Sequence, residues 1–261
     1  MQAFDQNLAG WREWQDAPWG RLRYTVASHN LARHLPPGPS AVLDVAGGNG
    51  LDAVPLAQAG HQVTVLDFSQ EMLNGARRLA EEHGVLERMT FRLADVAKVR
   101  DLFPADAFDV VLCHNLIQYV DDVDAVLVDL AYLLRPQGVL SLIAGNGYAY
   151  PLITVIRDGD PAKALDELDA PTAHTELFDV AVRRYASEDL LPALIRAGLE
   201  QEAQYGIRCV NDWIIDNECK EDAAFFAALE RLELALSARY PYYLLARMFH
   251  IIARKEVQSE S

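Results

Sequence analysis

The chain has 261 residues, of which 51% are hydrophobic and 23% are charged. This composition supports a substantial core and excludes a globally disordered chain, and the length fits one large domain or a domain with an insertion. There are 23 Lys and Arg residues against 38 Asp and Glu residues, so the formal net charge is −15. Such a charge argues against overall electrostatic attraction to nucleic acid or to an anionic membrane, although a local basic patch is compatible with it.

The cysteines and the apolar runs indicate the compartment. The cysteines are odd in number and lack the spacing of metal ligands, so we expect free thiols in a reducing compartment and no metal site: Cys113, Cys209 and Cys219. The first ten residues contain no basic segment followed by an apolar stretch, and no run of 18 apolar residues occurs. Neither a signal peptide nor a membrane span is therefore expected, and we predict a cytoplasmic protein without a membrane partner.

Short apolar runs alternate with helical patterns from residue 41 onward. Five runs are typical of strands in a sheet that is buried on both faces: residues 41–45, 62–67, 89–93, 108–113 and 139–143. Three segments between them have the spacing of helices: residues 51–59, 69–83 and 123–134. Because strands and helices alternate at this spacing, we predict an α/β fold with a doubly wound, largely parallel sheet.

The pattern of predicted strands and helices divides the chain into four parts. These are an N-terminal helical cap, a central core, an insertion after the fifth strand and a part that completes the sheet: residues 1–37, 38–145, 146–185 and 186–261. The insertion is rich in Gly and Pro and has no clean period. The last part contains a predicted helix that Ser187 caps, two strands and a second helix: residues 187–197, 200–208, 247–254 and 222–240. In the second helix, four apolar residues share one face: Phe225, Leu229, Leu232 and Leu236.

The N-terminal cap begins with closely spaced tryptophans. Trp11 and Trp14 are three residues apart, so a helix there places both on one face. Proline lacks a backbone N–H and crowds the preceding turn, so Pro18 is expected to end this helix. Trp19 then lies in a turn before a second helix over residues 21–35.

A glycine-rich turn joins the first predicted strand to the next helix: Asp44-Val45-Ala46-Gly47-Gly48-Asn49-Gly50. Glycines let the backbone turn sharply and approach a ligand, and the following helix N-terminus offers unpaired N–H groups. Seventeen residues after Gly50, Asp67 ends the second strand. A carboxylate at this position can accept both hydroxyls of a ribose. The combination predicts a nucleoside-binding site.

Two kinds of nucleoside cofactor fit this turn. Residues 48–53 match G-x-G-x-x-A, which leaves a nicotinamide-dependent dehydrogenase as an alternative. Against it, Asp44 ends the first strand where a dinucleotide site has apolar packing. A second acidic residue, Asp95, follows the third strand, and Leu134-Arg135-Pro136-Gln137-Gly138 precedes the fifth.

These residues resemble the signature of class I S-adenosylmethionine-dependent methyltransferases. The family has D-x-G-x-G-x-G after the first strand, and here Ala46 replaces the first glycine. It also has L-[RK]-P-G-G before the fifth strand, and here Gln137 replaces one glycine. The resemblance implies a Rossmann-like sheet of seven strands, whose last strand is antiparallel to the others. Residues 247–254 suit that place.

A narrower resemblance extends over nearly the whole chain. Three segments are similar to the bacterial tRNA 5-carboxymethoxyuridine methyltransferase family, which methylates the carboxylate of a modified wobble uridine: residues 20–23, 206–213 and 241–255. The two resemblances imply S-adenosylmethionine as cofactor and S-adenosylhomocysteine as product. The implied cofactor-binding residues are Arg23, Asp44, Ala46, Gly47, Gly48, Gly50, Asp67, Phe68, Asp95, Val96 and His114.

The resemblance implies a role for several of these residues. Arg23 would bind the carboxylate of the cofactor's methionine portion, and His114 would lie beside that portion. Asp67 would bind the ribose, and Asp95 and Val96 would flank the adenine. Ala46 and Gly47 would line the sugar and amino-acid portions. Arg208 and Tyr242 are candidate residues for binding the acceptor.

The acceptor is less clearly indicated than the cofactor. The tRNA-modifying family has a lysine-rich insertion, whereas residues 166–185 carry only two cations, Arg183 and Arg184, against five acidic residues. An acidic surface repels a polyanion, so a small-molecule acceptor is favoured over tRNA, which remains the alternative.

No catalytic residue follows from the sequence. A carboxylate acceptor is ionised at neutral pH and needs no base, whereas a hydroxyl or amine often does. His174, Tyr185 and His250 are candidate bases without a fixed geometry. A non-catalytic cofactor-binding module is a further alternative.

Overall fold

The computed structural model describes residue 15 and residues 17–175 and 180–257. The predicted helix with Trp11 and Trp14 lies outside the described residues. Among those described, no helix combines the length and apolarity needed to cross a bilayer. The chain divides into two compact units. We call residues 31–143, 190–203 and 251–261 the core unit, and residues 1–30, 144–189 and 204–250 the second unit.

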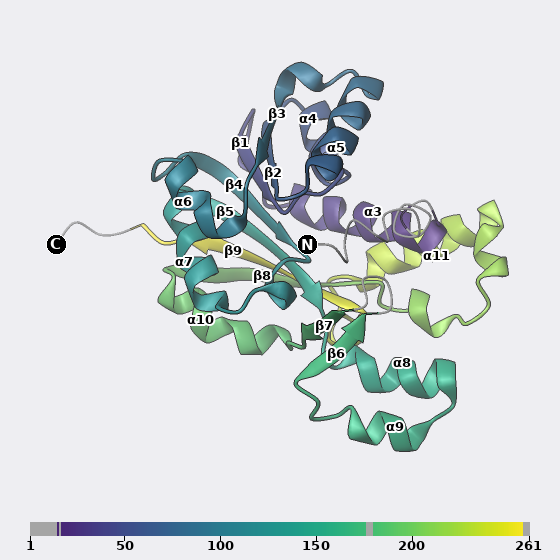
Figure 1. Ribbon diagram of the computed structural model, residues 1–261. Coiled ribbons are helices and arrows are strands. Elements are labelled where there is room, and N and C mark those ends of the chain that lie inside the picture. Colours follow the sequence, from purple (N-terminus) through teal and green to yellow (C-terminus); the bar gives the residue numbers. More distant parts are fainter. Residues whose placement is uncertain (1–14, 16, 176–179, 258–261) are drawn as a thin grey trace. The chain divides into compact units, whose positions relative to one another are not determined.

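The main sheet has seven strands in the order β3-β2-β1-β4-β5-β9-β8 (Figure 1). Their bounds are Ala41–Val45 (β1), Gln62–Asp67 (β2), Met89–Leu93 (β3), Phe108–His114 (β4), Leu134–Gly145 (β5), Leu199–Ile207 (β8) and Met248–Lys255 (β9). Strand β1 pairs in parallel with β2 and β4, β2 with β3, and β4 with β5. This order and direction confirm the predicted doubly wound α/β fold.

Apolar side chains of β1 and β4 form the centre of the core unit. Val42, Leu43, Val110, Val111 and Leu112 are fully buried, as expected for parallel strands covered on both faces. The helices of this unit are α4 (Ala53–Gln58), α5 (Gln70–Glu82), α6 (Val99–Leu102), α7 (Val123–Leu133) and α10 (Leu191–Arg196). Helices α4 and α5 contact β2, and α7 contacts α6 and α10 (Figure 1).

Strand β9 runs against the direction of its neighbours. The backbone N–H of Asn146 donates to the carbonyl of Arg247, and Arg254 donates to the carbonyl of Gln137. Residue numbers therefore fall along β5 as they rise along β9. This confirms the antiparallel last strand that the resemblance implied.

The second unit holds the remaining elements. They are most of α3 (Pro18–Ala32) and the whole of α8 (Ala149–Asp158), α9 (Pro161–Asp166), β6 (Thr172–Thr175), β7 (Val180–Arg183) and α11 (Ala223–Leu236). Strands β6 and β7 form an antiparallel two-stranded sheet, and α8 contacts α9. The sequence showed no period over this insertion because its elements are short. The domain boundaries at residues 37, 145 and 185 stay predictions.

The turn predicted at Trp19 is wrong. Helix α3 begins at Pro18, so Trp19 is already helical, and the N–H of Gly20 and of Arg21 both donate to the carbonyl of Ala17. Proline is favourable at the first helical position, because the N–H that it lacks would have no partner there and its φ is already helical.

The apolar face predicted for α11 is only partly correct. The helix ends at Leu236, four residues before the predicted end. Leu229 and Leu236 are buried, but Phe225 and Leu232 are exposed. Glu233, which is fully buried, takes part of the inward face. The predicted helix at 187–197 is also shorter, since residues 187–190 form a 3₁₀ turn before α10.

Candidate cofactor-binding site

The candidate site lies at the carboxyl ends of β1, β2 and β4, all in the core unit. Val45 of β1 is opposite Leu66 of β2 and Cys113 of β4. The loops that follow these strands therefore begin at the same edge, where open α/β sheets bind their ligands. The glycine-rich turn, Asp67 and His114 are brought together in this way.

The glycine-rich turn leaves no room for a side chain at its centre. A Cβ on Gly47 would lie 2.6 Å from Oδ2 of Asp44 and 2.9 Å from Cγ1 of Val65. A Cβ on Gly50 would lie 3.1 Å from the Cβ of Ala76. Gly47 thus lets the turn approach Asp44, whereas Gly50 lets the turn approach helix α5.

Two residues stand where the methyltransferase signature has glycine, and both have the backbone conformation of glycine. Ala46 has a φ of 55° and Gln137 a φ of 66°. This left-handed region costs an L-residue about 1–2 kcal/mol. The departures from the signature therefore preserve its geometry and carry local strain.

Asp67 is held by the main chain on two sides. Its Oδ2 accepts a hydrogen bond of 2.9 Å from the N–H of Gly48, and its Oδ1 accepts one of 2.8 Å from the N–H of Ser69. The residue is 5% exposed. These two hydrogen bonds fix the orientation of the carboxylate at the end of β2.

Asp95 and Val96 follow β3 at the same edge. The N–H of Ala94 donates to the carbonyl of Asp67 over 3.0 Å, which ties this loop to the end of β2. The Oδ1 of Asp95 accepts a hydrogen bond from the N–H of Ala97. Phe68, directly after Asp67, is 37% exposed.

His114 ends β4 and is buried between two polar partners. Its Nε2 lies 2.8 Å from Oγ of Ser141, and its Nδ1 lies 3.1 Å from Oδ2 of Asp52. Sequence reasoning missed Asp52, which follows the glycine-rich turn by two residues. No local pattern indicates this pairing, because 62 residues separate the two side chains.

Asn115 is a second residue that the sequence did not single out. It has a φ of 57°, and its N–H donates to the carbonyl of Ile143 over 2.7 Å. Its Oδ1 is buried and has no hydrogen-bond partner within the described part of the chain. An orphaned acceptor of this kind calls for a donor from a ligand or water.

Three predicted residues lie in the second unit. Arg23 of α3 is 2% exposed, and its guanidinium lies over the ring of Tyr24 at 4.5 Å. Arg208, with a φ of 61°, is paired with Asp212. Tyr242 is 45% exposed. Their predicted contacts with cofactor and acceptor stay predictions.

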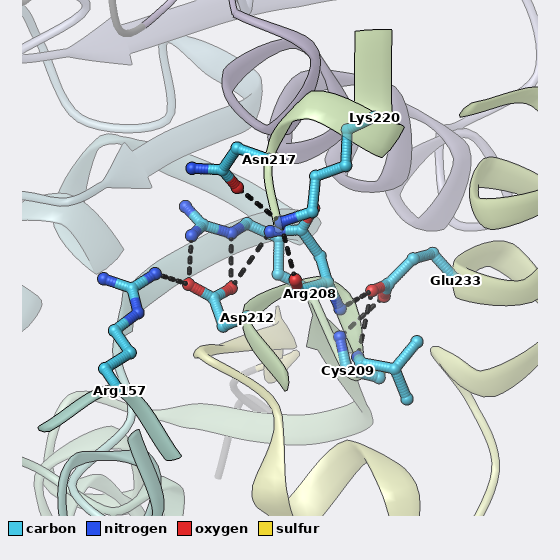
Figure 2. A network of polar contacts seen from close by, with 9 residues as sticks. Arg157, Arg208, Cys209, Asp212, Asn217, Lys220 and Glu233 are labelled. Carbon is cyan, nitrogen blue, oxygen red and sulfur yellow. Dashed lines mark hydrogen bonds and ion pairs between the residues drawn. The ribbon is translucent and has the colours of Figure 1, made fainter. Parts of the chain in front are cut away.

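A network of charged residues surrounds Asp212 in the second unit (Figure 2). Its Oδ1 accepts a hydrogen bond of 3.1 Å from Nη2 of Arg157, and its Oδ2 accepts one of 2.7 Å from Nε of Arg208. A second bond joins Nη2 of Arg208 to Oδ1. Burial alone raises the pKa of Asp212, but Arg208 and Arg247 outweigh it and hold that pKa below its usual value.

Glu233 serves the backbone of the same region. Its carboxylate accepts hydrogen bonds of 2.6, 3.0 and 2.7 Å from the N–H groups of Cys209, Val210 and Asn211 (Figure 2). These bonds explain why a carboxylate occupies the inward face of α11. Burial raises the pKa of Glu233 despite them.

The core unit fits a cofactor that carries a ribose and polar groups. The carboxylate of Asp67 is fixed by two backbone N–H groups, and the Asn115 oxygen has no donor among the described residues. The absence of a side chain at Gly47 lets the turn pack closely against Asp44 and Val65. These features match a nucleoside-bearing ligand rather than a purely apolar one.

Comparisons with known proteins agree with this geometry. Residues 42–138 match the family model of a methyltransferase domain. The chain is 29% identical over 259 residues to the tRNA 5-carboxymethoxyuridine methyltransferase of Escherichia coli K12, covering 97% of this chain and 94% of that relative. It is 36% identical over 128 residues to the ubiquinone biosynthesis O-methyltransferase of Xanthomonas axonopodis pv. citri, covering 48% and 49% of the two chains.

A solved structure shares the whole fold. A possible histamine N-methyltransferase from Thermotoga maritima, described as S-adenosylmethionine-dependent, superimposes with a TM-score of 0.65 at 16% identity. The match covers 98% of this chain and 99% of that one. The sheet order and the comparisons together support a class I S-adenosylmethionine-dependent methyltransferase.

Proposed function

We propose that this methyltransferase acts on a small-molecule acceptor and binds its cofactor at the edge formed by the glycine-rich turn, Asp67 and His114. The observation that carries the cofactor site is the doubly anchored carboxylate of Asp67, which is buried and fixed at the end of β2, where a carboxylate can bind the hydroxyls of a ribose. Asp95 and Val96, tied to the same strand end, flank the adenine in this proposal.

The methionine portion of the cofactor lies at the end of β4. His114, oriented by Asp52 and Ser141, borders it. The orphaned Oδ1 of Asn115 accepts a hydrogen bond from the α-ammonium group.

S-adenosylmethionine supplies a methyl group that its sulfonium already activates. The chain's own residues then have to align the acceptor with that methyl group and exclude water. A carboxylate acceptor needs no base, because it is ionised at neutral pH. Of the three candidate bases, His250 is fully buried, which makes it unsuitable for direct contact with an acceptor.

The charge of the insertion supports a small-molecule acceptor. Residues 166–185 contain two cations and five acidic residues, and the whole chain has a net charge of −15. This excess of negative charge disfavours binding of the phosphates of an anticodon loop. The ubiquinone-biosynthesis relative is consistent with this choice, although it matches only half of the chain.

A specific observation favours tRNA as the second candidate. The tRNA-modifying relative from Escherichia coli matches 97% of this chain, including the part outside the methyltransferase domain. In that case the wobble carboxymethoxyuridine is the acceptor, and a local cationic group must offset the acidic insertion.

Incubation with S-adenosylmethionine carrying a tritiated methyl group and a cell extract separates the two candidates. Acid-precipitable RNA and the small-molecule fraction are counted separately. We expect label in the small-molecule fraction. Label in RNA that mild alkali removes indicates a methyl ester on a modified base and would replace our proposal by the tRNA candidate.

A further inference from the structure

The second unit contains a cluster of positive charges around Asp212, although the chain as a whole is acidic. Four cationic side chains influence one carboxylate, Asp212: Arg157, Arg208, Lys220 and Arg247. Burying cations is unfavourable unless partners compensate them. The hydrogen-bond and ion-pair partners of the four side chains show which of them can still bind a ligand.

Arg208 and Lys220 are already satisfied within the unit. Arg208 is 7% exposed and forms a two-pronged pair with Asp212. Lys220 donates to the carbonyl of Asn211 over 3.0 Å and to Oδ1 of Asn217 over 2.8 Å (Figure 2). The nearby Glu233 is taken up by three backbone N–H groups, so it offers little to a further cation.

Arg247 differs from these residues. Among the described residues, its guanidinium forms no hydrogen bond and has no carboxylate within ion-pair distance. It lies over the ring of Tyr150 at 4.7 Å, and Arg184 lies over the same ring at 4.4 Å. Burial, together with Arg208 and Arg157, lowers the pKa of Arg247.

The backbone holds Arg247 in place. Its N–H donates to the carbonyl of Arg208 over 3.1 Å, and its carbonyl accepts from the N–H of Asn146 over 3.0 Å. The side chain is thus a pre-positioned, largely desolvated cation whose five N–H donors have no acceptor among the described residues. Such a group matches the geometry of a carboxylate.

We propose that Arg247, seated on Tyr150 and next to the Arg157–Asp212–Arg208 network, binds a carboxylate group of the methyl acceptor. This proposal deepens the proposed function and rests on it, because it names a chemical group that the acceptor carries. It also moves the acceptor-binding role from Arg208, whose guanidinium already pairs with Asp212, to Arg247.

The test uses two ligands that carry the same kind of carboxylate group, one on a small molecule and one on a nucleoside. Phenoxyacetate represents a small-molecule source and 5-carboxymethoxyuridine a nucleoside source, with neutral phenoxyacetamide and inorganic phosphate for comparison. Binding to the full chain is measured by calorimetry at constant ionic strength with S-adenosylhomocysteine present. We expect at least one carboxylate to bind about tenfold more tightly than the amide and than phosphate.

Two variants assign the effect to the residue. Arg247→Met keeps a long side chain without the charge, and we expect it to weaken carboxylate binding about tenfold. Arg183→Met removes an exposed arginine of the same unit and should leave carboxylate binding unchanged. Both variants should bind S-adenosylhomocysteine as tightly as the wild type, which would show that their fold is intact.

Three results would contradict the proposed role of Arg247. The proposal is overturned if neither carboxylate exceeds the amide, if phosphate binds better than both, or if Arg247→Met retains full binding. Failure of the wild type to bind S-adenosylhomocysteine would instead contradict the proposed function, so the two failures are distinguishable.

Discussion

The Oδ2 atom of Asp67 accepts a hydrogen bond of 2.9 Å from the backbone N–H of Gly48. This bond ties the end of β2 to the turn after β1, so one carboxylate organises the turn at the candidate site. A change in Asp67 is therefore expected to act on cofactor binding first.

Asp67→Asn should weaken the binding of S-adenosylhomocysteine by about tenfold or more, because hydrogen bonds to a charged acceptor contribute about 1.5–3 kcal/mol. The amide keeps the shape and one acceptor oxygen. Calorimetric titration measures the effect, and Asp101→Asn on the exposed surface of α6 serves as control. Equal affinities for the wild type and Asp67→Asn would remove Asp67 from the site.

Ala46→Gly and Gln137→Gly should each stabilise the protein by about 1 kcal/mol, since both residues have positive φ. Unfolding in urea provides the measurement. Ala59 has a φ of −72°, so Ala59→Gly should instead destabilise by about 0.5–1 kcal/mol. A loss of stability in both glycine variants of the first pair would show that the left-handed positions carry no strain.

Gly47→Ala should destabilise the protein by about 1–3 kcal/mol and weaken cofactor binding, because its Cβ would overlap Oδ2 of Asp44 at 2.6 Å. The matched control is Gly145→Ala, whose Cβ would meet only the hydroxyl of Tyr150 at 3.5 Å. Thermal unfolding and calorimetry follow the two effects. Tolerance of alanine at position 47 would contradict the described turn.

Asp212→Asn should cost about 3–5 kcal/mol at pH 7, because it leaves buried cations without their carboxylate. The pKa of Asp212 lies below its usual value of 3.8, so its contribution is complete above that pH and is lost as the pH falls through the folded-state pKa. The difference between wild type and variant, measured by urea unfolding, should therefore shrink in acid. A difference that is constant from pH 7 to pH 3 would argue against a charged Asp212.

The sheet could be predicted because its central strands are nearly continuous apolar runs and the longer helices between strands have a helical period. Val110, Val111 and Leu112 illustrate this, since all three are fully buried. Trp19 was wrongly predicted to lie in a turn because proline can both end and begin helices, and only the neighbouring backbone decides between them. Glu233 escaped prediction because its partners, the N–H groups of residues 209–211, lie more than 20 positions away.

Some residues of the candidate site could likewise be predicted from the sequence, and others could not. The glycine-rich turn and Asp67 belong to local motifs, so their meeting at one sheet edge follows from strand order. Asp52 beside His114 and the orphaned oxygen of Asn115 depend on contacts between distant segments. The same holds for Arg247 over Tyr150, which no sequence pattern indicates.

Calorimetric titration of the wild-type chain with S-adenosylhomocysteine, and separately with NAD, tests the central claim most directly. The account predicts saturable binding of S-adenosylhomocysteine at one site per chain and no binding of NAD. Binding of NAD alone would contradict it and would assign the glycine-rich turn and Asp67 to a dehydrogenase.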